Sequence, residues 1–208
     1  MHNEFDWPLL YSYRRCPYAM RARMALKVAG IHCKIIDIHL RDKPEHMLRV
    51  SPKGTVPVLC LSTDEVIDES LDIMHWALQQ NDPQRWFDGL SDEQAQYLLS
   101  QTDGPFKQAL DQYKYASRFP EKDPVSARES AMQALIDPLS AVLAQQHFIG
   151  GEKPVLQDIA IFPFVRQFAG VEPDWFSAHS PEAVRNWLTH WVQSDLFTAI
   201  MQKNVTHI

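Results

Sequence analysis

Cysteine is scarce in this chain of 208 residues, which contains only Cys16, Cys33 and Cys60. They form no C-x-x-C pair, and an odd number of cysteines argues against a disulfide framework. Free thiols are typical of reducing compartments, so we expect a cytoplasmic protein. The first ten residues agree with this expectation, because Glu4 and Asp6 stand where a secretory signal would have a basic region and an apolar run.

Long hydrophobic runs and an excess of positive charge are also lacking. The longest clean apolar run, from Ile159 to Val165, is far below the roughly 20 residues of a membrane-spanning helix, so no membrane partner is expected. The formal net charge is −6, whereas binding to nucleic acid depends on basic side chains, so no nucleic-acid partner is expected. The nine histidines show no ligand spacing, and we predict no metal site.

Acidic residues are missing from one stretch in particular, between Trp7 and Ile36. Its basic residues are Arg14, Arg15, Arg21, Arg23, Lys27 and Lys34. Residues 1–81 are neutral overall, and residues 82–208 carry the whole acidic excess. The local imbalance is suited to attracting a small anion or to stabilising a negatively charged side chain.

Strand and helix patterns alternate in the first 81 residues. The predicted elements are a strand over 8–13, a helix from Pro17 to Gly30, a strand over 34–38, a helix over 43–50, hairpin strands over 56–61 and 66–67, and a helix over 69–80. This order, βαβ followed by ββα, predicts one mixed sheet that its helices cover. Residues 82–90 are predicted to be a linker.

Residues 91–208 contain no segment with a strand period and are predicted to form an all-helical bundle domain. Four helices are expected in this region. The first begins at a cap at Ser91 and ends at about residue 117, and the second covers 135–143 with a kink at Pro138. The third covers 158–168 and is buried at the centre, and the fourth begins at 180–181. The predicted fold class is therefore α/β plus all-α, with a small mixed-sheet domain followed by a helical one.

Cys16 lies at the turn between the first predicted strand and the helix that Pro17 opens. Unpaired backbone N–H groups and the positive end of the helix dipole stabilise an anion at such a position. The nearby arginines favour the thiolate as well, so Cys16 is the candidate nucleophile. Cys33 and Cys60, before or within strands, are predicted to be buried apolar residues.

Four segments together carry a family resemblance: Tyr11 to Tyr18 around Cys16-Pro17, Ser51 to Leu59, Asp68-Glu69-Ser70, and Gln157 to Ala160. In this order they resemble the cytosolic glutathione transferase superfamily, and the cysteine makes them most similar to its omega-like and beta-like members. The resemblance covers both domains. It implies a thioredoxin-like glutathione-binding domain, a helical C-terminal domain and a homodimer.

The resemblance also implies how glutathione, as co-substrate, would be held. Pro57 would follow a cis peptide bond and present the backbone of Val56 to the cysteinyl part. Glu69 would bind the γ-glutamyl ammonium, and Ser70 with its helix N-terminus the adjoining carboxylate. Lys43 would meet the glycyl carboxylate. The alternatives are ordinary helix capping for Glu69 and Ser70 and a solvated surface position for Lys43.

The second substrate has four candidate contacts, Tyr18, Phe106, Tyr113 and Arg166. Phe106 and Tyr113 share one helix face, although aromatic residues at helical spacing are more often core. Arg166 would bind an anionic substrate group, with a paired structural arginine as the alternative.

The chain departs from the resemblance at two positions. Val155 stands where family members usually have a serine or threonine cap, which raises the question of what replaces the hydroxyl. Ala19 stands where dithiol glutaredoxin relatives have a second cysteine, so disulfide exchange would be monothiol.

We therefore predict a glutathione-dependent transferase in which Cys16 performs thiol transfer, or deglutathionylation, through a mixed disulfide with glutathione. Its partner would be a small-molecule or protein thiol. Conjugation of glutathione to electrophiles is one alternative. A non-catalytic module for ligand or protein binding on the same fold is the other.

Overall fold

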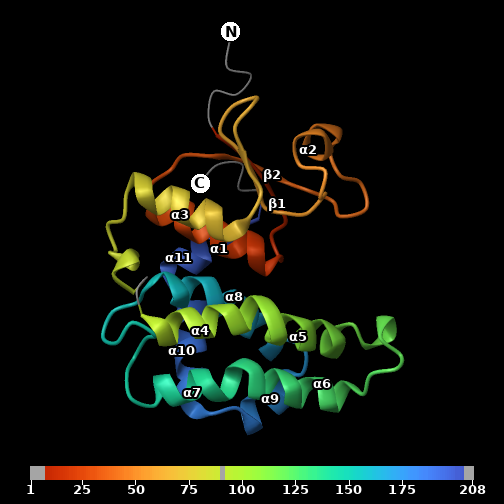
Figure 1. The fold of residues 1–208 in the computed structure, drawn as a ribbon, viewed down its shortest axis with the longest axis vertical. Helices are drawn as coiled ribbons and strands as arrows, with labels where there is room; N and C mark the ends of the chain where they lie inside the picture. Colours follow the sequence, from red (N-terminus) through yellow and green to blue (C-terminus); the bar gives the residue numbers. More distant parts are fainter. Residues whose placement is uncertain (1–7, 90–91, 204–208) are drawn as a thin grey trace. The chain divides into compact units, whose positions relative to one another are not determined.

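The computed structural model describes residues 8–89 and 92–203. These residues form two compact units, one of residues 8–85 with 194–203 and one of residues 86–89 with 92–193 (Figure 1). In these ranges, no helix is both long enough and apolar enough to cross a membrane. Ser91, the expected helix cap, lies outside the described residues.

The first unit is built on a four-stranded mixed sheet. Its elements are β1 (Leu9–Ser12), α1 (Pro17–Val28), β2 (Lys34–Asp37), α2 (Glu45–Val50), β3 (Val58–Cys60), β4 (Val66–Ile67), α3 (Ser70–Gln80) and α11 (Asp195–Met201). The strand order is β2-β1-β3-β4, with β2 parallel to β1 and the other pairs antiparallel. This is the thioredoxin-like βαβ and ββα arrangement that the sequence predicts.

The central strand β1 is buried on both faces. Leu9 and Tyr11 share one face with Met47 of α2 in a hydrophobic cluster. Leu10 points to the opposite face and is paired in register with Leu59 of β3. Helices α1 and α3 pack against each other, as their neighbouring ribbons in Figure 1 show. The end of β1, and the turn that follows it, is therefore fixed by packing on both sides.

Helix α11 belongs to the sheet unit, because it packs against α1. Its apolar residues Phe197 and Ile200 are buried. Ser194 caps it by accepting a hydrogen bond of 3.1 Å from the Phe197 N–H. The sequence pattern assigns residues up to 208 to the helical domain, since a short amphipathic helix does not indicate which domain buries its apolar face.

The second unit is built from helices and helical turns, with an isolated β-bridge between Phe148 and Gly151. Its elements are η1 (Trp86–Gly89), α4 (Glu93–Gln101), η2 (Thr102–Phe106), α5 (Lys107–Lys114), η3 (Ala116–Arg118), α6 (Pro124–Ala131), η4 (Met132–Ile136), α7 (Asp137–Leu143), α8 (Leu156–Ala169), α9 (Pro173–His179) and α10 (Glu182–Gln193). The segment predicted as a linker therefore contains a helical turn, η1.

The expected single helix as far as residue 117 is interrupted. Asp92 caps its first part, accepting a 2.9 Å hydrogen bond from the Ala95 N–H. The chain then passes through the π-helical turn η2, where Gly104 leaves helical geometry and Pro105 follows. Proline lacks an N–H and crowds the preceding turn, which explains the break. Near the kink predicted at Pro138, the helix changes from the π-helical turn η4 to α7, and Pro138 lies in the first turn of α7.

Helix α8 begins without a hydroxyl cap, and a backbone group replaces it. The carbonyl oxygen of Val155 accepts the Asp158 N–H at 3.0 Å. The Asp158 carboxylate in turn accepts from the N–H groups of Val155 and Ile149, each at 3.0 Å, and from Nε1 of Trp187 at 2.8 Å. Burial raises the pKa of Asp158 to about 6 in spite of these three donors.

The Val155 side chain occupies space left by two glycines. A Cβ atom at Gly89 would lie 2.7 Å from a Val155 methyl carbon, and one at Gly150 would lie 2.4 Å from it. Both distances are too short for real contacts, so the valine and the two glycines fit only together. The missing hydroxyl is thus compensated by packing as well as by the backbone.

Candidate functional site

Cys16 is the N-cap residue of α1, in the turn that follows β1. Its N–H donates to the carbonyl oxygen of Tyr13 at 3.0 Å, and its own carbonyl oxygen accepts from Met20 at 2.9 Å. The side chain makes no capping hydrogen bond, and Sγ lies 3.7 Å from the carbonyl oxygen of Val56. The first turn of α1 contains no acidic residue. The sulfur therefore lies at the positive end of a helix, where a thiolate is stabilised.

A buried arginine supports this turn from the helix side. Arg23, only 2% exposed, donates to the hydroxyl of Ser12 at 2.6 Å and to the carbonyl oxygen of Arg14 at 2.8 Å. Burial lowers the pKa of Arg23 to about 10, while the charges of Asp37 and Cys16 oppose this shift. Arg23 is thus a cation at neutral pH that fixes the backbone before Cys16.

The other two thiols are in a different environment. Cys33 and Cys60 are buried. Burial raises the pKa of Cys33 to about 12 and that of Cys60 to about 11. Both therefore stay protonated at neutral pH, in agreement with the prediction that they are packing residues, and Cys16 is the partly exposed thiol.

Cys16 opens onto a cavity of about 680 Å³ in the sheet unit. The cavity is lined by Cys16, Tyr18, Leu40, Lys43, Lys53, Gly54, Thr55, Val56, Pro57, Asp68, Glu69 and Ser70. This set includes every residue predicted for catalysis and for glutathione binding, together with Tyr18. The volume is in the range of small-molecule sites.

One wall of the cavity is the segment that precedes β3. The Val56–Pro57 peptide bond is cis, as the resemblance implies. Lys43 reaches the same wall from the segment before α2, and a Cβ atom at Gly54 would lie 3.4 Å from its Nζ. Gly54 has a φ of +62°, a backbone conformation that favours glycine at this point of the wall.

Another part of the lining is the start of α3. Glu69 is its N-cap residue and Ser70 its first residue. Two residues that the sequence analysis did not single out for the site join them, Lys53 and Asp68. The Nζ of Lys53 lies 2.5 Å from Glu69 Oε1 and 3.0 Å from Asp68 Oδ1. Lys53 lies in the Ser51 to Leu59 segment and Asp68 in the Asp68-Glu69-Ser70 segment, and membership of these segments is the sequence feature that could have pointed to them.

Ser70 also has a partner from α1. The Nε of Arg21 donates to its hydroxyl oxygen at 3.0 Å, and both side chains are buried. The Arg21 guanidinium carbon lies 5.1 Å from the centre of the Tyr18 ring. The guanidinium of Arg21, which belongs to the acid-free stretch of sequence, therefore contacts Ser70 at the cavity wall.

The remaining candidates lie in the helical unit. The Phe106 ring is fully buried and lies 5.7 Å from that of Phe168. Tyr113 is also buried, and its hydroxyl donates to Glu172 at 2.6 Å; burial and Glu172 raise the pKa of Tyr113. Within their own unit both rings are core residues. Arg166 is partly buried on α8, and burial lowers its pKa.

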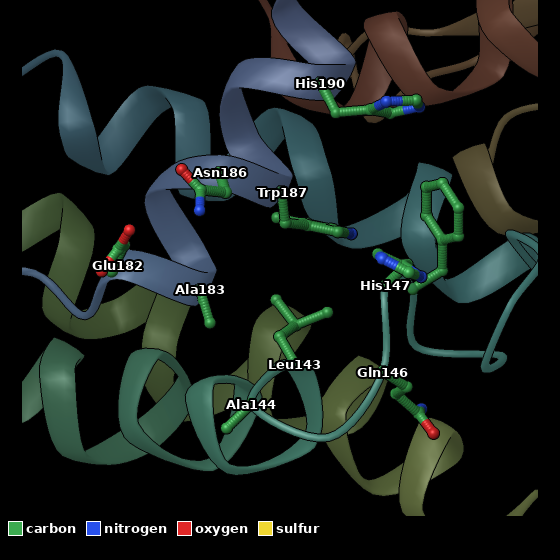
Figure 2. A pocket seen from close by; sticks show the side chains of 10 residues that line it. Leu143, Ala144, Gln146, His147, Glu182, Ala183, Asn186, Trp187 and His190 are labelled. Atoms are coloured by element: carbon green, nitrogen blue, oxygen red, sulfur yellow. The ribbon is translucent and has the colours of Figure 1, made fainter.

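A second cavity, of about 470 Å³, lies in the helical unit beside α7 and α10 (Figure 2). Figure 2 shows Ala183 and Trp187 of α10 on one side and Leu143 of α7 on the other. The lining contains no cysteine and none of the predicted site residues. The indole N–H of Trp187 already donates to Asp158. The cavity at Cys16 is therefore the better candidate for chemistry.

Comparison with known families agrees with both parts of the resemblance. The family model for the glutathione S-transferase N-terminal domain matches residues 10–86, and the model for the C-terminal domain matches residues 122–190. The chain therefore belongs to the cytosolic glutathione transferase superfamily.

Omega-class enzymes are among its relatives. Glutathione S-transferase omega-1 of Mus musculus is 25% identical over 180 residues, which cover 86% of this chain and 74% of that protein. Omega-1 of Rattus norvegicus is 45% identical over 62 residues, 30% of this chain and 26% of that protein. A solved Pseudomonas fluorescens glutathione transferase family member with two glutathione bound superposes with a TM-score of 0.76 at 21% identity, covering 96% of this chain and 95% of that one.

Proposed function

We propose that this protein is a glutathione-dependent thiol transferase with Cys16 as its nucleophile. One observation carries the proposal: Cys16 lines the same cavity as Lys43, Val56, Glu69 and Ser70. The cavity therefore combines a thiol at a helix N-terminus with a lysine and a glutamate, whose charges are opposite to those of the carboxylates and the ammonium of a γ-glutamyl tripeptide.

Each part of glutathione has a chemically suitable partner in this cavity. The Glu69 carboxylate suits the γ-glutamyl ammonium, and the hydroxyl and N–H of Ser70 suit the carboxylate beside it. The backbone of Val56 suits the cysteinyl amide, and Lys43 suits the glycyl carboxylate. Binding at these points would orient the tripeptide sulfur toward Cys16, so that attack becomes effectively unimolecular.

The proposed reaction has two thiol–disulfide exchanges. In the first, the Cys16 thiolate attacks the glutathione sulfur of a mixed disulfide; the S–S bond breaks, and the substrate leaves as a thiolate that takes up a proton. In the second, the thiolate of another glutathione attacks the glutathione sulfur on Cys16, releasing oxidised glutathione and regenerating the Cys16 thiolate. A stabilised thiolate assists both steps, first as the attacking group and then as the leaving group.

The exchange is proposed to be monothiol. Three residues after Cys16, the position of a second active-site thiol in dithiol enzymes, Ala19 is fully buried in α1. Cys33 and Cys60 are buried with raised pKa values, so neither is suited to resolve the mixed disulfide. A second glutathione is therefore the resolving thiol.

The proposal also covers the second substrate, the oligomeric state and the cellular compartment. The second substrate would be a small-molecule or protein thiol carried as its glutathione mixed disulfide. We further propose a homodimer in the cytoplasm, where the three free cysteines would stay reduced.

The test begins with oxidised glutathione and mass spectrometry of the intact protein and its peptides. We expect one glutathione adduct, on Cys16. Turnover of a small glutathionyl disulfide by the wild type should then be lost in Cys16→Ser and kept in Cys33→Ala, the matched control at a buried cysteine. Thiol transfer that persists in Cys16→Ser would overturn the proposed mechanism.

The same proteins decide between the alternatives. Conjugation of glutathione to an aromatic electrophile that survives Cys16→Ser would indicate a conjugating enzyme. Glutathione binding with neither reaction would indicate a non-catalytic module.

A further inference from the structure

Lys53 places a cation next to Glu69, the carboxylate that the proposed function assigns to the ammonium of glutathione. Its Nζ lies 2.5 Å from Glu69 Oε1 and 3.0 Å from Asp68 Oδ1. The hydrogen bonds that Lys53 donates to Glu69 and Asp68 raise the pKa of Lys53, so it is charged at neutral pH. An alkyl ammonium therefore already contacts the group proposed to bind the tripeptide's ammonium.

Asp68 gives this lysine a second anchor. The Ser51 hydroxyl, which is fully buried, donates to Asp68 Oδ2 at 2.7 Å and fixes that carboxylate to the sheet unit. Burial tends to raise the pKa of Asp68, but the hydrogen bonds from Ser51 and Lys53 outweigh it and leave the pKa below its ordinary value. No other residue that the structure describes holds the Glu69 carboxylate in this way, and its side chain is 64% exposed. Glu69 can therefore change partner while Asp68 retains Lys53.

The charges balance after such an exchange. Asp68 and Glu69 carry two negative charges, and Lys53 carries one positive charge. The remaining negative charge matches one ammonium group. If Lys53 stays on Asp68, an incoming ammonium takes its place on Glu69 and both carboxylates remain paired.

We propose that Lys53 is an internal competitor for the ammonium subsite and thereby reduces the affinity of the site for peptides with a free α-ammonium. This inference rests on the proposed function, since it assigns Glu69 to the γ-glutamyl ammonium. Lys53 is 46% exposed, and exposed ion pairs contribute little free energy. The expected effect on affinity is therefore modest, about two- to fivefold at low salt.

The test measures dissociation constants by calorimetry for S-methylglutathione, whose thioether cannot react with Cys16. Lys53→Met should bind this ligand about two- to fivefold more tightly than the wild type. Lys34→Met is the matched control, because Lys34 is an exposed lysine on β2 outside the cavity lining, and its affinity should equal that of the wild type. Equal or weaker binding by Lys53→Met would overturn the proposal.

A second ligand separates competition from a general change of charge. Glutaryl-S-methylcysteinylglycine is S-methylglutathione without the α-amino group, so it cannot compete with Lys53 for Glu69. Lys53→Met should bind this analogue no more tightly than the wild type, because the substitution only removes attraction for an anion. Equal tightening for both ligands would also overturn the proposal.

These measurements are independent of the thiol chemistry. A wild type that fails to bind S-methylglutathione would contradict the glutathione site itself. Binding with no tightening in Lys53→Met would leave that site in place and overturn only the role of Lys53.

Discussion

The Nε of Arg21 on α1 donates a hydrogen bond of 3.0 Å to the hydroxyl oxygen of Ser70 on α3, and both side chains are almost fully buried. An arginine from the acid-free stretch thus meets the serine proposed to hold a carboxylate. Because the hydroxyl oxygen accepts from Arg21, its proton is free to point to another acceptor.

Ser70→Ala should lower the free energy of unfolding by about 1–3 kcal/mol, because it removes a buried acceptor from Arg21. Urea denaturation measures this change. Ser62→Ala is the control, since that hydroxyl lies in an exposed turn, and its effect should stay within about 0.5 kcal/mol. In a cycle with Arg21→Met the two losses should add incompletely, and full additivity would mean that the hydrogen bond contributes nothing.

Thiol labelling should distinguish the three cysteines. With an aromatic disulfide reagent at pH 7, we expect one rapidly reacting thiol in the folded protein and three after denaturation, because Cys33 and Cys60 are buried with raised pKa values. Cys16→Ser should abolish the rapid reaction. Rapid labelling of two thiols in the folded wild type would contradict this picture.

Arg23→Met should slow alkylation of Cys16 by iodoacetamide at pH 7, by roughly three- to tenfold, because a buried cation within reach of the thiolate is lost. Arg15→Met is the charge-matched control. Arg15 is exposed and bonds to the Tyr13 hydroxyl, so solvent screens its charge and the rate should barely change. Equal slowing in both variants would show that burial of Arg23 is irrelevant to the thiol.

Asp158 should make stability depend on pH in the mildly acidic range. Its pKa is raised to about 6 in the folded chain, against about 3.9 in an unfolded one, so its contribution is present below pH 4 and is lost as pH rises through 6. The expected loss is up to about 3 kcal/mol. Denaturation of wild type and Asp158→Asn between pH 4 and 7 measures it, and identical pH profiles would refute the assignment.

Gly150→Ala should destabilise the helical unit by about 1–3 kcal/mol, because its Cβ would lie 2.4 Å from a methyl carbon of Val155. Adding Val155→Ala removes that methyl group and should recover part of the loss. Thermal denaturation of the single and double variants checks this coupling. Simple additivity would show that the two side chains do not compete for the same space.

Much of the architecture follows from local sequence patterns. The strand before Cys16, the helix that Pro17 opens and the hairpin strands were predicted because strand periodicity, turn residues and proline position act over a few residues. The predictions failed where local patterns were ambiguous. The helix expected as far as residue 117 is broken at Gly104 and Pro105, and α6, α9 and α11 were not delineated as separate helices within the predicted all-helical region.

The sequence by itself determined which residue is the candidate nucleophile, because Cys16 owes its position to its neighbours in the chain. Tertiary structure decided what the distant residues do: it paired Arg21 with Ser70 and Lys53 with Glu69, and it buried Phe106 and Tyr113 in the core of the helical unit. The physical reason is the sequence separation of the residues that interact. Helix starts and turns depend on adjacent residues, whereas ion pairs and core contacts depend on which elements the sheet and the bundle bring together.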